Sequence, residues 1–172
     1  MRLPRLFLAA LLFAWVGMVA AQAPQSFAKP VLASAIPKPG PKDLCPVCGM
    51  LVSKYPHWVA TIVYKDGHAH HFDGAKDLLK FWFDPPKYAA GHSREQMARI
   101  AVTDYYNLQR IDAKTALYVI GSDVLGPMGH EFVPLANLAD AEEFLKEHKG
   151  KRILRFDQIT KEMPLQLDDG KF

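Results

Sequence analysis

The feature that most limits how this chain can fold is a pattern of strand, strand, helix and strand that occurs twice. In the first pass, β-branched and aromatic residues at 57–66 predict a strand, and 68–72 predict the strand that returns after a Lys-Asp-Gly turn. Apolar residues at helical spacing follow Asp73, which can cap a helix, and a pair of prolines ends that helix. Residues 98–105 predict the last strand of this pass.

The second pass repeats this order in the C-terminal half. Strands are predicted at 115–121, 131–135 and 152–159. The helix before the last of them is capped by Asn137 or Asp140. The two passes agree in order and length more than in identity, so we infer a duplicated strand-strand-helix-strand unit. The sequence therefore predicts an α+β protein with mixed sheets and with helices packed on one face.

Composition and pattern together divide the chain into five segments. The segment before the folded part is rich in proline and poor in large apolar residues, so it cannot offset the entropy of ordering and is expected to be disordered. The segments are a signal peptide at 1–21, a proline-rich linker at 22–43, a first unit at 44–110, a second unit at 111–160 and an irregular tail at 161–172.

The N-terminal segment predicts export. Arg2 and Arg5 precede an uncharged apolar run, and the Val-Ala-Ala sequence that ends at Ala21 is a pattern that signal peptidase cleaves. The run is slightly short for a membrane span, although an uncleaved anchor stays open as an alternative. No cysteine lies near the cleavage point, so no lipid anchor is expected, and we predict a soluble periplasmic protein.

Charge limits the class of partner. The chain has 21 Lys and Arg against 18 Asp and Glu, and the signal peptide holds two of the arginines and none of the acids. The mature chain is therefore close to neutral. A nearly neutral protein has no electrostatic reason to bind nucleic acid, and membrane contact is expected only through a partner.

The chemistry is concentrated in the sequence Cys-Pro-Val-Cys-Gly-Met, directly after the linker. Cys45 and Cys48 are the only two cysteines, and with Met50 they place three sulfur donors within one short loop. Thiolate and thioether ligands favour Cu(I), whereas Zn²⁺ prefers a tetrahedral set of thiolates or imidazoles. Pro46 stiffens the loop, and Gly49 lets it turn so that the methionine can approach the thiols. We therefore predict a Cu(I) site.

Three other interpretations of the cysteine pair stay open. A disulfide between Cys45 and Cys48 would close a very short loop and constrain the unfolded chain by only about 2 kcal/mol. A periplasmic thiol–disulfide oxidoreductase would use the pair for redox chemistry, although such a pair normally begins a helix that follows a strand. A zinc-stapled interaction domain would need further ligands, for which His57, or His70 with His71, could serve.

Other donors lie further along the chain. Met128 is part of a Gly-Pro-Met-Gly loop, and His57 could reach the sulfur site if the chain folds back. His68 and His70 alternate onto one face of the predicted return strand, where solvated histidines are commoner than a metal site. His92 has no evident partner in the sequence. The candidate metal ligands are therefore Cys45, Cys48, Met50, Met128 and His57.

Four motifs, in order, resemble the NosL family, the accessory proteins of nitrous oxide reductase maturation. They are Cys-Pro-Val-Cys-Gly-Met, His-Phe-Asp before the first helix, Gly-Pro-Met-Gly, and Arg-Phe-Asp-Gln-Ile near the end, and the similarity covers about 43–160. The resemblance implies a duplicated strand-strand-helix-strand fold. It also implies that Cys45, Cys48 and Met50 form the metal-binding motif of the family and that Met128 matches its later methionine.

For function, the resemblance implies a periplasmic Cu(I) metallochaperone that is not an enzyme. Such a protein passes copper to an acceptor, namely nitrous oxide reductase, its membrane assembly machinery or a related cuproenzyme. Many family members are lipoproteins with a lipidated cysteine at the mature N-terminus, and this sequence has none there. A loop with three sulfur donors and no obligatory fourth ligand also suits the exchange of copper between proteins.

Overall fold

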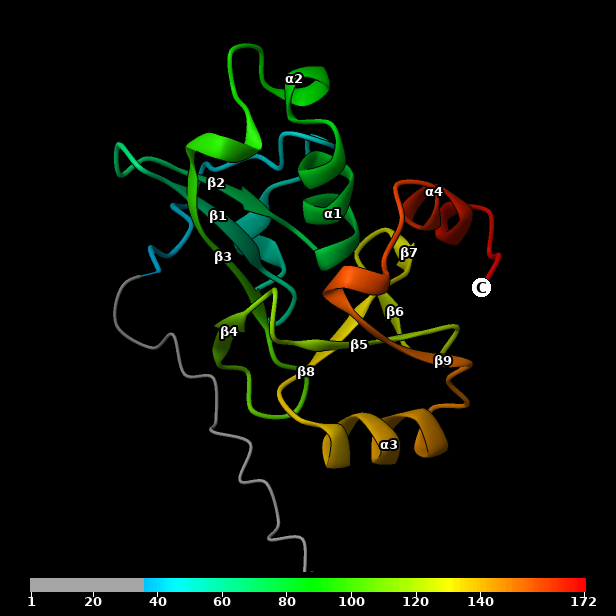
Figure 1. The fold of residues 1–172 in the computed structure, drawn as a ribbon. Coiled ribbons are helices and arrows are strands. Elements are labelled where there is room, and N and C mark those ends of the chain that lie inside the picture. The colour runs from blue at the N-terminus through cyan, green and yellow to red at the C-terminus, as the bar shows by residue number, and fades with distance from the viewer. Residues whose placement is uncertain (1–35) are drawn as a thin grey trace, which may run out of the picture.

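Two sheets, each with a helix packed against it, form the two halves of the structure (Figure 1). The structure is a computed structural model that describes residues 36–172. The predicted signal peptide at 1–21 and the first part of the predicted linker lie outside the described residues. Among residues 36–172, no helix has the length and apolar character needed to cross a membrane.

The described elements alternate short strands with short helices. The strands are β1 (Ala60–Tyr64), β2 (Ala69–Phe72), β3 (Met97–Thr103), β4 (Arg110–Asp112), β5 (Leu117–Ile120), β6 (Leu125–Gly126), β7 (Gly129–His130), β8 (Val133–Leu135) and β9 (Arg152–Arg155). The helices are α1 (Ala75–Phe83), α2 (Pro85–Tyr88), α3 (Leu138–Glu147), α4 (Met163–Asp168) and the 3-10 turns η1 (Val52–Lys54), η2 (Arg94–Gln96) and η3 (Phe156–Gln158).

The first sheet is built around the strand that opens the first unit. Its order is β2-β1-β3-β4, with Ala60 of β1 opposite Phe72 of β2 and Ile62 of β1 opposite Ile100 of β3. α1 follows β2 and leads the chain to β3 on the other side of β1. β4 extends the sheet at its edge, so the predicted boundary between 110 and 111 falls inside a strand of the first unit.

The second sheet repeats this arrangement. Its order is β8-β5-β9, and α3 leads the chain from β8 to β9 on the other side of β5. In both units the first strand is central, its antiparallel partner lies on one side, and the strand after the helix lies on the other. The predicted α+β fold with duplicated strand-strand-helix-strand units is therefore confirmed. β6 and β7 form a small hairpin between β5 and β8, and its turn carries the Gly-Pro-Met-Gly sequence.

In place of the predicted mixed sheets, every strand pairing within residues 36–172 is antiparallel. α1 connects β2 and β3, which run in the same direction, but β1 lies between them and runs the opposite way. β5 separates β8 from β9 in the same manner. A helical crossover commonly joins neighbouring parallel strands, and here the central strand keeps those strands apart.

One hydrophobic core joins the two halves. Ile62 of the first sheet and Tyr118 of the second belong to the same cluster of buried residues. α3 covers the opposite face of the second sheet over a smaller core that includes Val119 and Phe144 (Figure 1). Alternation along β5 explains this division, because Tyr118 and Ile120 face the main core while Val119, between them, faces α3.

The two main helices begin differently. Asn137 caps α3, since its side chain accepts a hydrogen bond from the backbone N–H of Asp140 at 2.9 Å. Of the two predicted caps, Asn137 and Asp140, the first is therefore confirmed. The prediction that Asp73 caps α1 is wrong, because Gly74 is the N-cap residue and no side chain caps this helix. Instead, the carboxylate of Glu131 accepts a hydrogen bond from the first turn of α1.

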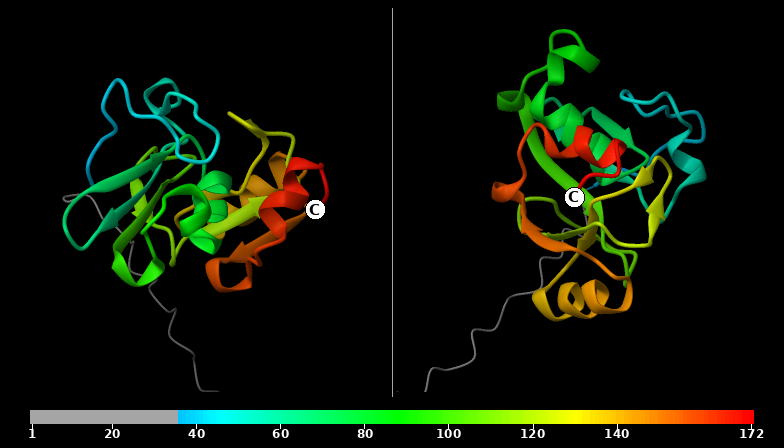
Figure 2. Two further views of the ribbon diagram at one scale, coloured as in Figure 1. Left: turned by 90° about the horizontal axis from the view of Figure 1, so that it is seen from above. Right: turned by 90° about the vertical axis from the view of Figure 1, so that its right-hand side faces the viewer.

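The tail is more regular than predicted. Residues 161–172, expected to be irregular, contain α4, which packs beside α1 in all views (Figures 1 and 2). Pro164 and Leu167 are buried there, and Asp168 forms ion pairs with two lysines of α1. The prediction of an irregular tail is therefore wrong. The helix could not be foreseen because six residues are too few to show a helical period in the sequence.

The described end of the predicted linker, residues 36–43, is tied to the folded part. The N–H of Gly40 donates to the carboxylate of Asp43 at 2.8 Å, and the N–H of Val52 donates to the carbonyl of Asp43 at 3.0 Å. The Asp43 carboxylate also lies 3.8 Å from Nε2 of His71 on β2. Disorder was predicted from composition, which could not reveal these contacts because the partners lie later in the sequence.

Candidate metal centre

The two cysteines lie in a tight loop that is closed by backbone contacts. Leu44 pairs with Leu51 across the base of the loop. The N–H of Cys45 donates to the carbonyl of Met50 at 2.8 Å, and the N–H of Gly49 donates to the carbonyl of Cys45 at 2.9 Å. Gly49 has a φ of +76°, a left-handed conformation that glycine adopts without strain. The prediction that this glycine lets the loop turn is confirmed.

Two buried carboxylates at the start of α1 face this loop. Asp73 directly follows β2, and Asp77 lies four residues later in the first turn of the helix. Cys45, Asp73 and Asp77 are each at most 2% exposed, whereas Cys48 is half-buried. One ligand atom from each of these four side chains lies within 4.8 Å of the other three. We call Cys45, Cys48, Asp73 and Asp77 the Cys-Asp cluster.

Each thiol of the Cys-Asp cluster lies next to one carboxylate. Sγ of Cys45 is 3.5 Å from Oδ2 of Asp77, and Sγ of Cys48 is 3.3 Å from Oδ1 of Asp73. The other two carboxylate oxygens are buried and have no hydrogen-bond partner within residues 36–172. Nζ of Lys80 lies 3.3 Å from Oδ1 of Asp77, close enough for charge attraction but not aligned as a hydrogen bond. The cluster therefore offers lone pairs that a cation can satisfy.

Burial keeps both thiols protonated when no cation is present. It raises the pKa of Cys48 to about 12 and raises the pKa of Cys45 well above its ordinary value, and the charge of Asp77 acts in the same direction on both. The two thiols are free rather than joined in a disulfide. A thiol–disulfide oxidoreductase needs a depressed thiol pKa, so the raised pKa values of Cys45 and Cys48 do not fit that interpretation.

The Cys-Asp cluster joins two soft sulfur atoms with hard carboxylate oxygens. Sulfur donors favour Cu(I), while two thiolates and two carboxylates also form a set that Zn²⁺ accepts. A cation that entered the cluster would replace the thiol protons and offset the charge of the two buried carboxylates. The arrangement is therefore suited to holding a metal cation.

The two predicted methionine ligands lie on loops at the N-terminal end of α1. Met50 is half-buried in the cysteine loop. Met128 is 43% exposed in the turn between β6 and β7, and its backbone carbonyl accepts a hydrogen bond from Nζ of Lys76 at 2.7 Å. This bond holds the turn against the helix that carries Asp77. Ligation by either sulfur stays a prediction.

A buried network fixes the β6–β7 turn and α4 to α1. Lys76 is fully buried, and its Nζ lies 2.8 Å from Oδ1 of Asp168 on α4. Glu131 accepts the backbone N–H of Lys76 at 2.5 Å and that of Phe132 at 2.9 Å, and burial raises its pKa to about 8. A Cβ at Gly74 would collide with the Glu131 carboxylate, so a larger residue there would displace this carboxylate from its hydrogen bonds.

The structure does not bring His57 to the Cys-Asp cluster. Its side chain is exposed between η1 and β1, and it is absent from both groups of metal-capable side chains found within residues 36–172. The sequence interpretation missed Asp73, which was taken as a helix cap, and Asp77. The available signal was a pair of acids four residues apart at the start of a predicted helix, a spacing that places both on one side.

Known proteins share this fold and sequence. A sequence model of the NosL family matches residues 37–164. The copper-binding lipoprotein NosL of Stutzerimonas stutzeri is 30% identical over 119 residues, which make up 68% of this chain and 62% of that protein. The crystal structure of the copper chaperone NosL from Shewanella denitrificans superposes with a TM-score of 0.59 at 29% identity, over 77% of this chain and 98% of that one.

The alignment with the Stutzerimonas protein spans less than two thirds of its length. The family match, in contrast, takes in both units of the fold and all four residues of the Cys-Asp cluster. It confirms the resemblance that the four sequence motifs indicated. The chain belongs to the NosL family.

Proposed function

We propose that this protein is a periplasmic metallochaperone that carries Cu(I) in the Cys-Asp cluster, with Cys45 and Cys48 as its principal ligands. The observation that carries the proposal is the convergence of two free thiols with two buried carboxylates, all within 4.8 Å. Soft sulfur donors select a soft monovalent ion, and the carboxylates supply negative charge around it. Met50 and Met128 are the further sulfur donors that we expect to complete the site.

The relatives support copper as the cargo. One is named a copper-binding lipoprotein and the other a copper chaperone. Both names describe binding or carrying a metal rather than catalysis, which agrees with the prediction that this protein is not an enzyme. We propose that its acceptor is nitrous oxide reductase, the membrane machinery that assembles that reductase, or a related cuproenzyme.

The unequal burial of the two cysteines suits transfer. Cys45 is 1% exposed, whereas Cys48 and Met50 are half-buried and Met128 is 43% exposed. A copper ion bound here would therefore be more accessible at Cys48 than at Cys45. An acceptor thiolate or imidazole that approached from this side could bond to the ion before Cys45 released it, so that copper would never be free in solution.

The carboxylates also favour a second candidate cargo, Zn²⁺. Two thiolates and two carboxylates form a tetrahedral set of the kind that zinc accepts. A protein with zinc in the Cys-Asp cluster would be a zinc-stapled interaction domain rather than a copper carrier. Metal analysis of the protein purified without added metal, followed by competition between Zn²⁺ and Cu(I), distinguishes the two functions.

An anaerobic titration with Cu(I) against a chromophoric chelator tests the proposal. We expect one tightly bound copper ion in the wild type and its loss in Cys45→Ser/Cys48→Ser. X-ray absorption of the copper-loaded protein should show sulfur neighbours. Met50→Leu should weaken binding. The matched control is Met97→Leu, since Met97 of β3 lies opposite Tyr64, at the end of β1 remote from Asp73. Equal copper uptake by the wild type and the double serine variant would refute the proposal.

A further inference from the structure

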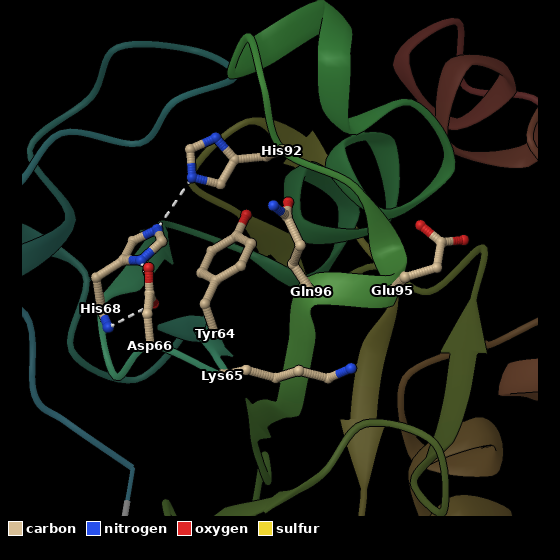
Figure 3. Close-up of a pocket in the computed structure, with 7 residues that line it drawn as sticks. All are labelled: Tyr64, Lys65, Asp66, His68, His92, Glu95 and Gln96. Atoms are coloured by element: carbon tan, nitrogen blue, oxygen red, sulfur yellow. Dashed lines mark hydrogen bonds and ion pairs between the residues drawn. The ribbon is translucent and has the colours of Figure 1, made fainter.

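A second group of ring nitrogens lies away from the Cys-Asp cluster. His70 belongs to β2, His68 lies just before that strand, and His92 comes from the loop between α2 and η2. One ring nitrogen of each histidine lies within 4.8 Å of the other two. Figure 3 shows the rings of His68 and His92 facing one another, with the ring of Tyr64 beside that of His68. We call His68, His70 and His92 the histidine triad.

Asp66 fixes the proton of His68 on the side that faces away from the triad. Nδ1 of His68 lies 2.6 Å from Oδ1 of Asp66, and a carboxylate there accepts the Nδ1 proton. Nε2 of His68 then carries the lone pair of this ring, which accepts a hydrogen bond from Nε2 of His92 at 3.1 Å in the absence of a metal ion. A carboxylate that holds the outer nitrogen of an imidazole is the usual support of a metal-binding histidine.

Tyr64 positions the rings of His68 and His70. Its ring stacks on that of His68 with centroids 4.2 Å apart and an interplanar angle of 5°, and its hydroxyl lies 3.0 Å from Nδ1 of His70. The second ring nitrogen of His70 is therefore available to a ligand.

The spacing of the nitrogens fits a bound ion. Two imidazole nitrogens on one tetrahedral Zn²⁺ lie about 3.3 Å apart, given the usual zinc–nitrogen bond length. The Nε2 atoms of His68 and His92 lie 3.1 Å apart, so small side-chain rotations suffice for both to bind one ion. A cavity of about 260 Å³ opens beside these two rings and has room for a water molecule as a further ligand.

We propose that the histidine triad is a second metal site, which takes a divalent transition-metal ion, Zn²⁺ or Cu²⁺, through one nitrogen of each ring, with Asp66 orienting His68. Imidazole is the ligand that these ions share, and the triad has no thiol that would select Cu(I). The site is separate from the Cys-Asp cluster. His70 lies on β2 and Asp73 directly follows this strand, so the two residues are about 10 Å apart along the extended chain. A bound ion would tie the His92 loop to the β1–β2 hairpin.

Histidine ¹⁵N NMR with Zn²⁺ as the probe tests the proposal directly on the wild-type protein. We expect the ring nitrogens of His68, His70 and His92 to shift together and to saturate at the same zinc concentration. The exposed His57 should not move with them. The proposal is overturned if the three rings respond no more than His57 does.

Zinc affinity of variants provides the second test. His68→Ala and His92→Ala should each weaken zinc binding at the triad by at least about 100-fold, and Asp66→Asn by about 10- to 100-fold. His57→Ala is the matched control and should bind zinc as the wild type does. Cu(I) uptake by Cys45 and Cys48 should be unchanged in all of them, so failure here and failure of the proposed function give different results. Unchanged zinc stoichiometry and affinity in folded His92→Ala would overturn the proposal.

Discussion

Sγ of Cys45 lies 3.5 Å from Oδ2 of Asp77, and the two side chains are 1% and 2% exposed. A thiol and a carboxylate buried side by side cannot both be charged without a large electrostatic cost, so the thiol keeps its proton. A metal cation removes that cost because its positive charge replaces the proton. If the Cys-Asp cluster binds a metal ion as proposed, binding should therefore release the thiol protons.

Metal affinity should therefore rise steeply with pH. Burial raises the pKa of Cys48 to about 12 and raises the pKa of Cys45 well above its ordinary value, so both thiols are protonated between pH 6 and 8 and must release two protons to bind as thiolates. The apparent affinity for Cu(I) should then increase by up to about 100-fold per pH unit. Chelator competition at pH 6, 7 and 8 measures this slope, and an affinity independent of pH would contradict the assignment of two thiolate ligands.

Removal of the charge of Asp77 should make the metal-free thiols more reactive and weaken metal binding. In Asp77→Asn burial still raises the pKa of Cys45, but the charge of Asp77 no longer adds to this shift, so a larger fraction of thiolate forms. We expect faster alkylation by iodoacetamide and copper binding weakened by about 10-fold. Asp157→Asn, at an exposed acid outside the cluster, is the control. Slower alkylation in Asp77→Asn would show that this carboxylate does not hold the thiol proton.

The main elements could be predicted because each forms from a contiguous stretch with its own pattern. The β-branched run that became β1 and the apolar residues at helical spacing that became α1 are examples. β4, with three residues, and α4, with six, are too short to show a period, and both depend on contacts with distant parts of the chain. The antiparallel pairing also depends on the order of strands in space, which no local pattern contains.

The Cys-Asp cluster was predictable only where its members are neighbours in sequence. Cys45 and Cys48 lie in one short motif, so their shared role was evident. Asp73 and Asp77 lie close to the two cysteines only because the end of β2 and the start of α1 pack against the cysteine loop. His92 likewise meets His68 across a gap of 24 residues, which is why no partner for it was evident from local patterns. Convergence of this kind is a property of the packed chain.

Loss of the α4 carboxylate should destabilise the fold. Oδ1 and Oδ2 of Asp168 each lie 2.8 Å from a lysine of α1, and one of these, Lys76, is fully buried. Asp168→Asn leaves that ammonium without its ion-pair partner, so the free energy of unfolding should fall by about 1–3 kcal/mol, a value reduced by the partial exposure of Asp168. Urea unfolding followed by circular dichroism measures the change.

The adjacent acid is the control for this variant. Asp169 pairs with Lys171 on the surface, so Asp169→Asn should have almost no effect on the unfolding free energy. A second variant, Lys76→Met/Asp168→Asn, removes the buried charge together with its partner and should recover much of the lost stability. Equal destabilisation by Asp168→Asn and Asp169→Asn would show that the buried lysine does not depend on α4.

Stability should also fall as pH rises, because of Glu131. Burial raises its pKa from the ordinary value of 4.5 to about 8 in the folded protein. The folded state therefore binds the proton more tightly than the unfolded state. This contribution to stability is complete below about pH 4.5 and is lost as pH rises through about 8, with a size on the order of a few kcal/mol.

Glu131→Gln keeps an oxygen that accepts the two backbone N–H groups but cannot ionise. Urea unfolding at pH 5.5, 7 and 8.5 should show a decline in the wild type and in Glu162→Gln, an exposed control, but a much smaller decline in Glu131→Gln. Parallel declines in all three proteins would place the titrating group elsewhere.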